Sequence, residues 1–423
     1  MHGGGCGGGK GVETPMFVDG YPFELMTIEM NQEPGSAASP RRWIPRPQAT
    51  DPDTLERLFG TAENLLPLWI AEPSVDAPPG VVEALAERSA DRHYGYEVRP
   101  DSTMAAFWSW MVGHHGWSGE GLRAVVSPSV GTSIGVLIEQ FTEPGQGVII
   151  QPPVFTDFKT LIRDAGRRVV TSPLELGAGG YHMNLADLET RAADTDTTMM
   201  ILCSPHNPVG RVWSKTELSE VGEICARHGV FVVADEIHAD VILGEGRFHP
   251  YAGVAGGLSG HHWAATHGPI KTFGLAGVCD TVVVTDDEEV VERFERRSSQ
   301  LHLTRNNVFS LAAFETAYLT GAPWFADFIS MIRENLGILR DGLPEPLRLV
   351  EPGGTYLAWL DFRELGLGVR ELAGWLAAEA GLALSPGHWF GRQGAGFARM
   401  TIAVPPETIS EAVARLTTAV ARR

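Results

Sequence analysis

The chain has 423 residues, of which 43% are hydrophobic and 20% charged, a composition typical of a folded protein with more than one core. Its formal net charge of −19 argues against nucleic acid and anionic membrane surfaces as partners. Four widely spaced cysteines and the lack of a membrane-length apolar run indicate a cytoplasmic protein without a disulfide framework or a metal site.

The N-terminal segment is predicted to lie outside the folded cores. Residues 1–14 are rich in glycine, which predicts disorder. The stretch Asn31–Asp53 is rich in Pro, Ser and Arg and predicts an extended arm. We therefore assign residues 1–61 to a disordered N-terminus followed by an arm.

Residues 62–305 alternate strand and helix signals and predict an α/β domain. Short apolar runs predict buried strands, and the segments between them have helical spacing. The predicted strands are Val125–Ser127, Gly147–Gln151, Thr198–Cys203, Val230–Ala234 and Thr281–Thr285, and the predicted helices include Gly131–Phe141 and Leu218–His228. This alternation predicts a large domain with a mainly parallel, doubly wound sheet.

Residues 306–423 have a different pattern and predict a smaller α+β domain. A long helical stretch extends from Asn306 to about Leu339. It is followed by a strand at Thr355–Phe362, a helix at Val369–Ala380 and a strand at Phe397–Val404.

Three motifs place polar groups beyond strands of the predicted sheet, the edge where such sheets bind ligands. Asn207, in Ser204-Pro205-His206-Asn207-Pro208, follows one strand, and Asp235 ends the next. Lys271, in Gly268-Pro269-Ile270-Lys271-Thr272-Phe273-Gly274, is expected in a later loop. Alone, each has a commoner explanation: a turn, a helix cap or a surface lysine. Together, an amide, a carboxylate and an amine are the groups that a pyridoxal phosphate (PLP) site needs.

The three motifs resemble those of fold-type I PLP enzymes, the class I/II aminotransferase superfamily. Further segments are similar to its MalY/PatB-like cystathionine β-lyase branch. They are Leu66–Glu72, Gly95-Tyr96, Asp235-Glu236-Ile237-His238 and Gly354-Thr355-Tyr356-Leu357. The resemblance extends roughly from Leu65 to Leu416 and implies a PLP-dependent enzyme acting on an amino acid.

The resemblance also implies roles for residues around the cofactor ring. Lys271 would carry the cofactor, and Asp235 would bind the pyridine nitrogen. Asn207 would bind the phenolic oxygen, near which His238 would lie. Phe155, where the family commonly has tyrosine, would stack on the ring. A helix start and a core position are equally ordinary explanations for His238 and Phe155.

Other residues are expected to bind the phosphate. Gly131 and Thr132 begin a predicted helix, whose free N–H groups and dipole favour an anion. Tyr96 matches a tyrosine that the partner subunit contributes in this family, which implies a homodimer. The family's serine before the lysine is replaced by Ile270, and a common asparagine by Gly274.

The substrate side of the site depends on Arg399 and the loop at Glu72. Arg399 matches the family's clamp on the substrate carboxylate, a role that suits a planar guanidinium. Glu72 stands where the branch commonly has aspartate. The family's behaviour implies C–S β-elimination from an S-conjugated cysteine to thiol, keto acid and ammonia, with Lys271 as the base.

Other outcomes stay open at this point. Transamination is one, and decarboxylation coupled to oxidative deamination is another. Lincosamide-antibiotic pathways contain relatives that differ in this way, by elimination or by oxidative decarboxylation of S-conjugated cysteines. A role in antibiotic biosynthesis is therefore a reasonable hypothesis. A PLP-sensing regulator is a different class of function, but the short N-terminal segment offers no basic DNA-binding module. A catalytically dead relative would not be expected to keep the lysine, aspartate and arginine.

Overall fold

The structure, a computed structural model, describes residues 16–18, 21–23 and 46–423. The glycine-rich stretch 1–14 and most of the arm expected at Asn31–Asp53 lie outside these residues. Strands β1 (Met16–Val18) and β2 (Tyr21–Phe23) pair antiparallel. The described end of the N-terminal segment contains helix α1 (Pro52–Phe59), capped by Asp51.

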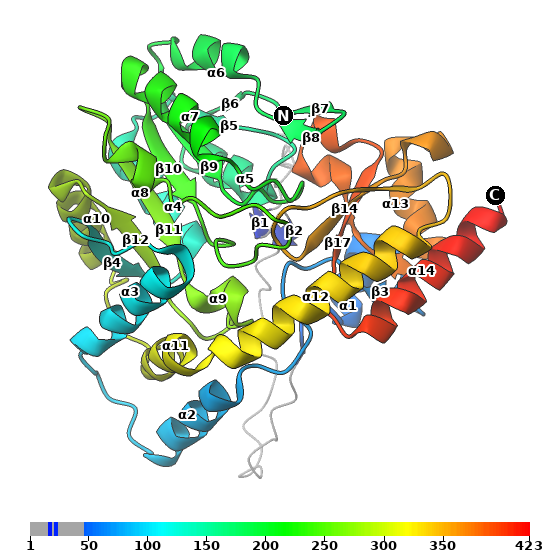
Figure 1. Cartoon of the computed structure of the whole chain (residues 1–423), viewed down its shortest axis with the longest axis horizontal. Coiled ribbons are helices and arrows are strands. Elements are labelled where there is room, and N and C mark those ends of the chain that lie inside the picture. The colour runs from blue at the N-terminus through cyan, green and yellow to red at the C-terminus, as the bar shows by residue number, and fades with distance from the viewer. Residues whose placement is uncertain (1–15, 19–20, 24–45) are drawn as a thin grey trace, which may run out of the picture.

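A seven-stranded sheet forms the centre of the larger part of the molecule (Figure 1). In spatial order its strands are β4 (Arg123–Ser127), β12 (Thr281–Thr285), β11 (Trp263–His267), β10 (Phe231–Asp235), β9 (Thr197–Cys203), β5 (Gly147–Ile150) and β6 (Arg168–Thr171). Only β12 runs antiparallel to its neighbours. The predicted α/β fold with a mainly parallel sheet is confirmed.

Helices cover both faces of this sheet because its strands are apolar on both sides. In β5, Val148 and Ile150 pack into one hydrophobic cluster and Ile149 into the other. The first cluster includes side chains of α4 (Val130–Phe141), α5 (Thr156–Asp164) and α10 (Glu288–Gln300). The second includes side chains of α3 (Asp101–His115), α6 (Leu185–Ala192), α7 (Lys215–His228) and α8 (Ala252–Ala255).

The C-terminal part is built on a four-stranded antiparallel sheet. Its strands, in spatial order, are β13 (Arg348–Val350), β14 (Leu357–Asp361), β17 (Phe397–Thr401) and β16 (Ser385–Pro386). The helices of this part are α12 (Ala322–Gly342), α13 (Val369–Ala378) and α14 (Pro406–Ala421), with 3-10 turns η1 (Arg363–Leu365), η2 (Gly387–Phe390) and η3 (Arg392–Gly394). Helices α12 and α14 lie side by side (Figure 1).

The single helical stretch expected from Asn306 to Leu339 is wrong, since the structure has two helices there. Helix α11 (Val308–Thr320) ends at Gly321, where α12 begins. A Cβ at Gly321 would lie 2.4 Å from the Phe273 ring, so a tertiary contact makes glycine necessary at this break.

The chain crosses between the two parts more than once. Strand β3 (Leu66–Pro67) pairs with β15 (Leu382–Ala383), whereas α11 packs against α2 (Pro79–Ala90) and α3. Strands β7 (Glu175–Gly177) and β8 (Gly180–His182) form a separate hairpin. The division at residues 61/62 and 305/306 stays a prediction.

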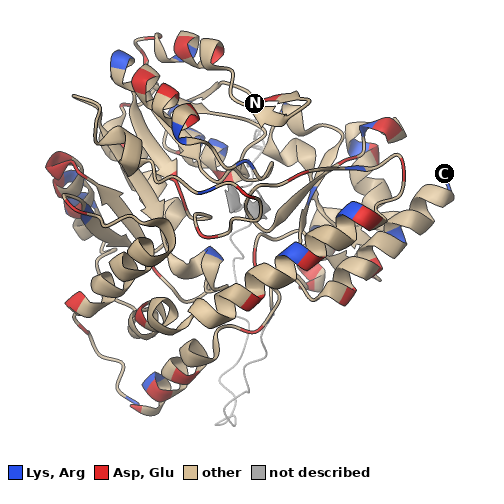
Figure 2. Ribbon diagram, viewed as in Figure 1, with Lys and Arg blue, Asp and Glu red and all other residues tan. Residues whose placement is uncertain are grey.

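Charged side chains are dispersed over the outer helices, with acidic and basic residues interspersed (Figure 2). Cys203, Cys225 and Cys279 are buried and unbonded to one another. Within the described ranges, no helix combines the length and apolar character needed to cross a membrane.

Candidate active site

A cavity of about 390 Å³ opens beyond the carboxyl ends of β9 and β10. Seven of the ten residues predicted for the site line it: Gly131, Phe155, Asn207, Asp235, His238, Lys271 and Arg399. Six of them belong to the part built on the seven-stranded sheet and Arg399 belongs to β17 of the C-terminal sheet, so the cavity lies where the two parts meet. Thr132, Glu72 and Tyr96 are not among the lining residues.

Lys271 lies in α9 (Pro269–Thr272), a four-residue helix that begins at a proline, so the expected loop position is wrong. Gly274 follows with a φ of +71°, a left-handed conformation that suits glycine. The Nζ of Lys271 donates a hydrogen bond to the carbonyl of Ala71 at 2.7 Å. This contact brings the amine to the loop that also carries Glu72.

Asp235 ends β10 and is buried, with 5% exposure. Its Oδ1 accepts hydrogen bonds from the Thr266 hydroxyl at 3.1 Å and the Ile237 N–H at 3.3 Å. Burial raises the pKa of Asp235 to about 6, against the opposing effects of these hydrogen bonds and the Lys271 charge. A carboxylate buried in this way favours a cationic partner in the cavity.

His238 supplies a neutral imidazole to the same cavity. Burial, followed by the charges of Lys271 and Arg399, holds the pKa of His238 well below its ordinary value. Its Nδ1 is buried without a hydrogen-bond partner among the described residues. The ring meets Tyr356 edge-on, with centroids 5.7 Å apart. A buried polar atom without a partner indicates a position for a bound polar group.

Arg399 and Asn207 are bonded directly to each other. The Nη1 of Arg399 donates to Oδ1 of Asn207 at 3.0 Å, and Nη2 donates to the carbonyl of Trp69 at 2.8 Å. The guanidinium also lies over the Phe390 ring, 4.8 Å from its centroid. With 3% exposure, Arg399 is a buried cation whose orientation is fixed by its partners.

The N-terminus of α4 forms another wall of the cavity. Ser129, the N-cap, accepts a hydrogen bond from the N–H of Thr132 at 3.1 Å, and its hydroxyl lies 2.9 Å from the Thr132 hydroxyl. Thr132 is therefore engaged by its own cap, whereas Ser129, Val130 and Gly131 face the cavity. A Cβ at Gly131 would meet only the Ser129 hydroxyl, at 3.9 Å, so this wall has room for an anion.

The remaining predicted residues differ in their placement. Phe155 lines the cavity at the start of α5 and packs edge-on against Phe158. Glu72 follows Ala71, and its charge adds to burial in raising the pKa of Tyr356. Tyr96 is 85% exposed and is not brought to the cavity of its own chain.

Sequence reasoning missed several groups that shape the cavity. Cys203 lines it, and its Sγ accepts the N–H of Asn207 at 3.4 Å. Asp157 and Ile70 also line it. The position of Cys203 at the end of β9 was a usable signal. The backbone carbonyls of Trp69 and Ala71 had no such signal in the sequence, because any residue type can present a backbone carbonyl.

The arrangement fits PLP on chemical grounds. The buried Asp235 carboxylate suits a protonated pyridine nitrogen, and the amide of Asn207 suits a phenolic oxygen. The unpartnered Nδ1 of His238 gives the cavity an unused polar atom. The helix N-terminus at Gly131 suits a phosphate, and Lys271 supplies an amine.

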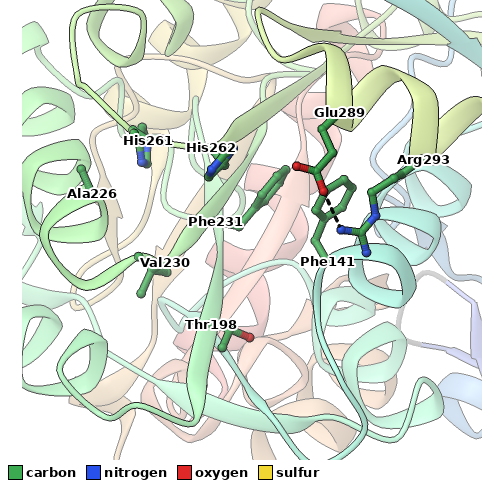
Figure 3. A pocket seen from close by; sticks show the side chains of 11 residues that line it. Phe141, Thr198, Ala226, Val230, Phe231, His261, His262, Glu289 and Arg293 are labelled. Carbon is green, nitrogen blue, oxygen red and sulfur yellow. Dashed lines mark hydrogen bonds and ion pairs between the residues drawn. The ribbon is translucent and has the colours of Figure 1, made fainter.

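A second cavity, of about 220 Å³, lies near the amino ends of β9 and β10, and Figure 3 shows the residues that line it. Thr198, near the start of β9, and Phe231, the first residue of β10, line it. Glu289 and Arg293 of α10 pair there at 3.1 Å. No lysine lines this cavity and it shares no lining residue with the first, so its chemistry does not match that of the first.

Comparisons with known proteins agree with this geometry. The family described as "Aminotransferase class I and II" matches residues 66–416. Cystathionine beta-lyase PatB of Bacillus subtilis is 34% identical over 86% of this chain and 94% of that protein. Protein MalY of Escherichia coli is 33% identical over 86% and 93%.

Two solved structures share the fold. Cystalysin from Treponema denticola, which contains a pyridoxal 5'-phosphate cofactor, has a TM-score of 0.82 and 26% identity over 88% of this chain and 95% of that one. A PLP-bound C–S lyase from Staphylococcus hominis has a TM-score of 0.77 and 25% identity over 86% and 93%. The chain therefore belongs to the class I and II aminotransferase family, with homologues in the MalY/PatB cystathionine β-lyase group.

Proposed function

We propose that this protein is a PLP-dependent C–S β-lyase that cleaves an S-conjugated L-cysteine to a thiol, a keto acid and ammonia. The observation that carries the proposal is the convergence of Lys271, Asp235, Asn207 and Arg399 on one cavity. The names of the relatives, cystathionine β-lyase and C–S lyase, support the same reaction.

The cofactor would supply an electron sink for the bonds that break at the amino acid. Lys271 would hold PLP through its Nζ and, when the substrate displaces that link, would take the proton from Cα. The Asp235 carboxylate would keep a proton on the ring nitrogen. Because Asp235 is buried, this ion pair would be little screened by water.

Arg399 would bind the substrate carboxylate. Its contacts with Asn207 and Trp69 hold the guanidinium in place before substrate arrives, which lowers the entropic cost of binding. A carboxylate held on Arg399 favours loss of the Cα proton over loss of carbon dioxide. This clamp is why we place elimination ahead of decarboxylation coupled to oxidative deamination. Transamination also begins with loss of the Cα proton, and the names of the relatives, cystathionine β-lyase and C–S lyase, support elimination over it.

A homodimer is part of the proposal. Tyr96 is 85% exposed and Val98 88% exposed, in a segment without helix or strand. In the family that this chain resembles, the partner subunit contributes a tyrosine at this position, and the exposure of Tyr96 leaves its side chain accessible for such a contact. In the proposed dimer, Tyr96 would reach the phosphate end of the other subunit's cavity. A role in specialised metabolism rests on the unusual residues Phe155, Ile270 and Glu72.

The reaction is tested by incubating PLP-loaded protein with cystathionine and with S-alkyl and S-glycosyl cysteines. Thiol, keto acid, carbon dioxide and oxygen uptake are followed together. We expect thiol and keto acid in equal amounts without carbon dioxide. Carbon dioxide and oxygen uptake with the C–S bond intact would contradict the lyase and favour oxidative deamination.

Two variants control this assay. Lys271→Ala removes the proposed base and should abolish thiol release. Lys215→Ala removes an exposed lysine at the start of α7 and should leave release unchanged. Equal activity of the two variants would contradict the role of Lys271.

A further inference from the structure

Asp240 is a buried carboxylate outside the cavity, five residues after Asp235. Its side chain is 4% exposed and accepts three hydrogen bonds. His115 Nε2 lies 2.6 Å from Oδ1, Trp110 Nε1 donates to the same oxygen at 2.9 Å, and the Thr272 hydroxyl donates to Oδ2 at 2.5 Å. Asp240 thus joins α3 to α9.

Neighbouring groups stabilise the ionised form of the Asp240 carboxylate. Burial alone would raise the pKa of Asp240, but the hydrogen bond and charge of His115, with the bonds from Thr272 and Trp110, hold it below its ordinary value. An ionised Asp240 accepts hydrogen bonds and donates none, so the Thr272 hydroxyl must donate to it. A charge-assisted hydrogen bond of this kind is stronger than a neutral one.

Helix α9 depends on contacts from outside itself. It has four residues, Pro269–Thr272, which is far below the length at which a helix is stable alone. Thr272 directly follows Lys271, so a hydrogen bond at Thr272 restrains the backbone that carries the amine. Before α9, His267 pairs with Glu236 at 2.9 Å, which ties the other end of the helix to the same Asp235–Asp240 segment.

We propose that Asp240, through Thr272, is a positioning residue that sets where Nζ of Lys271 stands relative to Asp235. The inference rests on the proposed PLP chemistry and goes beyond it, because Asp240 does not line the cavity. One short segment then carries the carboxylate for the ring nitrogen and the anchor for the amine. Displacing a reacting group by about 1 Å can cost about a hundredfold in rate.

The test compares two substitutions at one position. Thr272→Val removes the hydroxyl and keeps the shape, whereas Thr272→Ser keeps the hydroxyl. For each PLP-loaded protein, the cofactor absorbance is titrated against pH, and kcat, KM and Tm are measured. The absorbance midpoint reports the surroundings of the Lys271 amine and does not depend on turnover.

In Thr272→Val we expect the midpoint to move by about 0.5 pH unit or more, because the surroundings of the amine set its proton affinity. We expect kcat to fall by about tenfold to a hundredfold, with KM within about twofold, because the change affects the reacting amine and not the carboxylate clamp. Thr272→Ser should restore both quantities to near the wild-type values.

A matched control separates positioning from stability. Thr285→Val makes the same chemical change in β12, where a buried hydroxyl donates to the Trp263 carbonyl at 2.7 Å. It should lower Tm and leave the midpoint and kcat unchanged. The inference is overturned if Thr272→Val behaves like wild type, or if Thr285→Val changes midpoint and kcat as much. A wild-type protein without PLP absorbance would instead overturn the proposed cofactor, and this inference with it.

Discussion

Burial of the Asp235 carboxylate lowers the stability of the cofactor-free protein at neutral pH, and the same burial suits the carboxylate to pairing with a cationic group. Two hydrogen bonds and the charge of Lys271 do not offset its burial, and its pKa stays raised at about 6. The unfolded chain titrates the same group near 3.8, so the folded cofactor-free protein binds the extra proton between about pH 4 and pH 6. Stability contributed by Asp235 therefore falls as pH rises through this window.

The substitution Asp235→Asn should remove that pH dependence. At pH 8 the cofactor-free variant should be more stable than wild type by about 1–3 kcal/mol, and the difference should vanish near pH 4. Activity should fall at least about a hundredfold, because a neutral amide cannot keep the ring nitrogen protonated. Urea unfolding of both proteins at several pH values measures the difference. Parallel pH curves would contradict the assignment.

Arg399 is the residue proposed to bind the substrate carboxylate. Arg399→Lys keeps the charge but loses the fork that also binds Asn207 and the Trp69 carbonyl. KM should rise by about tenfold to a hundredfold, which corresponds to one or two lost hydrogen bonds to a charged group. Steady-state kinetics measure it, with Arg340→Lys on the exposed face of α12 as control. An unchanged KM would show that Arg399 does not bind substrate.

At the scale of elements, the buried strands were the most predictable features. β9, β10 and β12 are continuous apolar runs, and their bounds agree with prediction within one residue. Helix α9 was missed because four residues show no helical periodicity. The break between α11 and α12 was missed because the Phe273 ring, distant in sequence, requires it.

In the site, as in the fold, residues with a local sequence signal were predictable and contacts between distant segments were not. Motifs next to strand ends identified Asn207, Asp235 and Lys271, whose side chains line the cavity. Thr132 was predicted to bind the phosphate, and this stays a prediction; in the structure it bonds to Ser129, the helix cap, and does not line the cavity. The Asp240 network joins segments that lie 32 and 130 residues apart, and no local pattern reveals such a contact.

The N-terminus of α4 offers a test at the element scale. Gly131→Ala places a methyl group in open space, so the cofactor-free protein should be more stable by about 0.5–1 kcal/mol. The same methyl group would stand where an anion would approach the helix, so PLP should bind at least about tenfold more weakly. Thermal unfolding and cofactor titration measure the two effects. If the variant gains stability without losing PLP affinity, the phosphate must bind somewhere other than this helix N-terminus.

At the scale of the whole molecule, the proposed dimer makes each cavity depend on two chains. Tyr96 is exposed in one chain, and the Arg305 guanidinium lies over its ring at 5.3 Å. If Tyr96 completes the partner's cavity, Tyr96→Ala and Lys271→Ala should each be inactive alone. Mixed and reassembled, they should regain about a quarter of the wild-type activity, because half of the dimers then hold one intact site. No recovery would place Tyr96 in its own chain's site, and a Tyr96→Ala variant that is active alone would place Tyr96 outside any site.

Mapping the residue to which PLP attaches would show whether the cavity is a PLP site. Purified protein loaded with PLP is reduced with borohydride, digested and mapped by mass spectrometry. We expect the added pyridoxyl mass on Lys271 and its loss in Lys271→Ala. Attachment at Lys159 or Lys215, or no attachment at all, would contradict the assignment of the cavity as a PLP site.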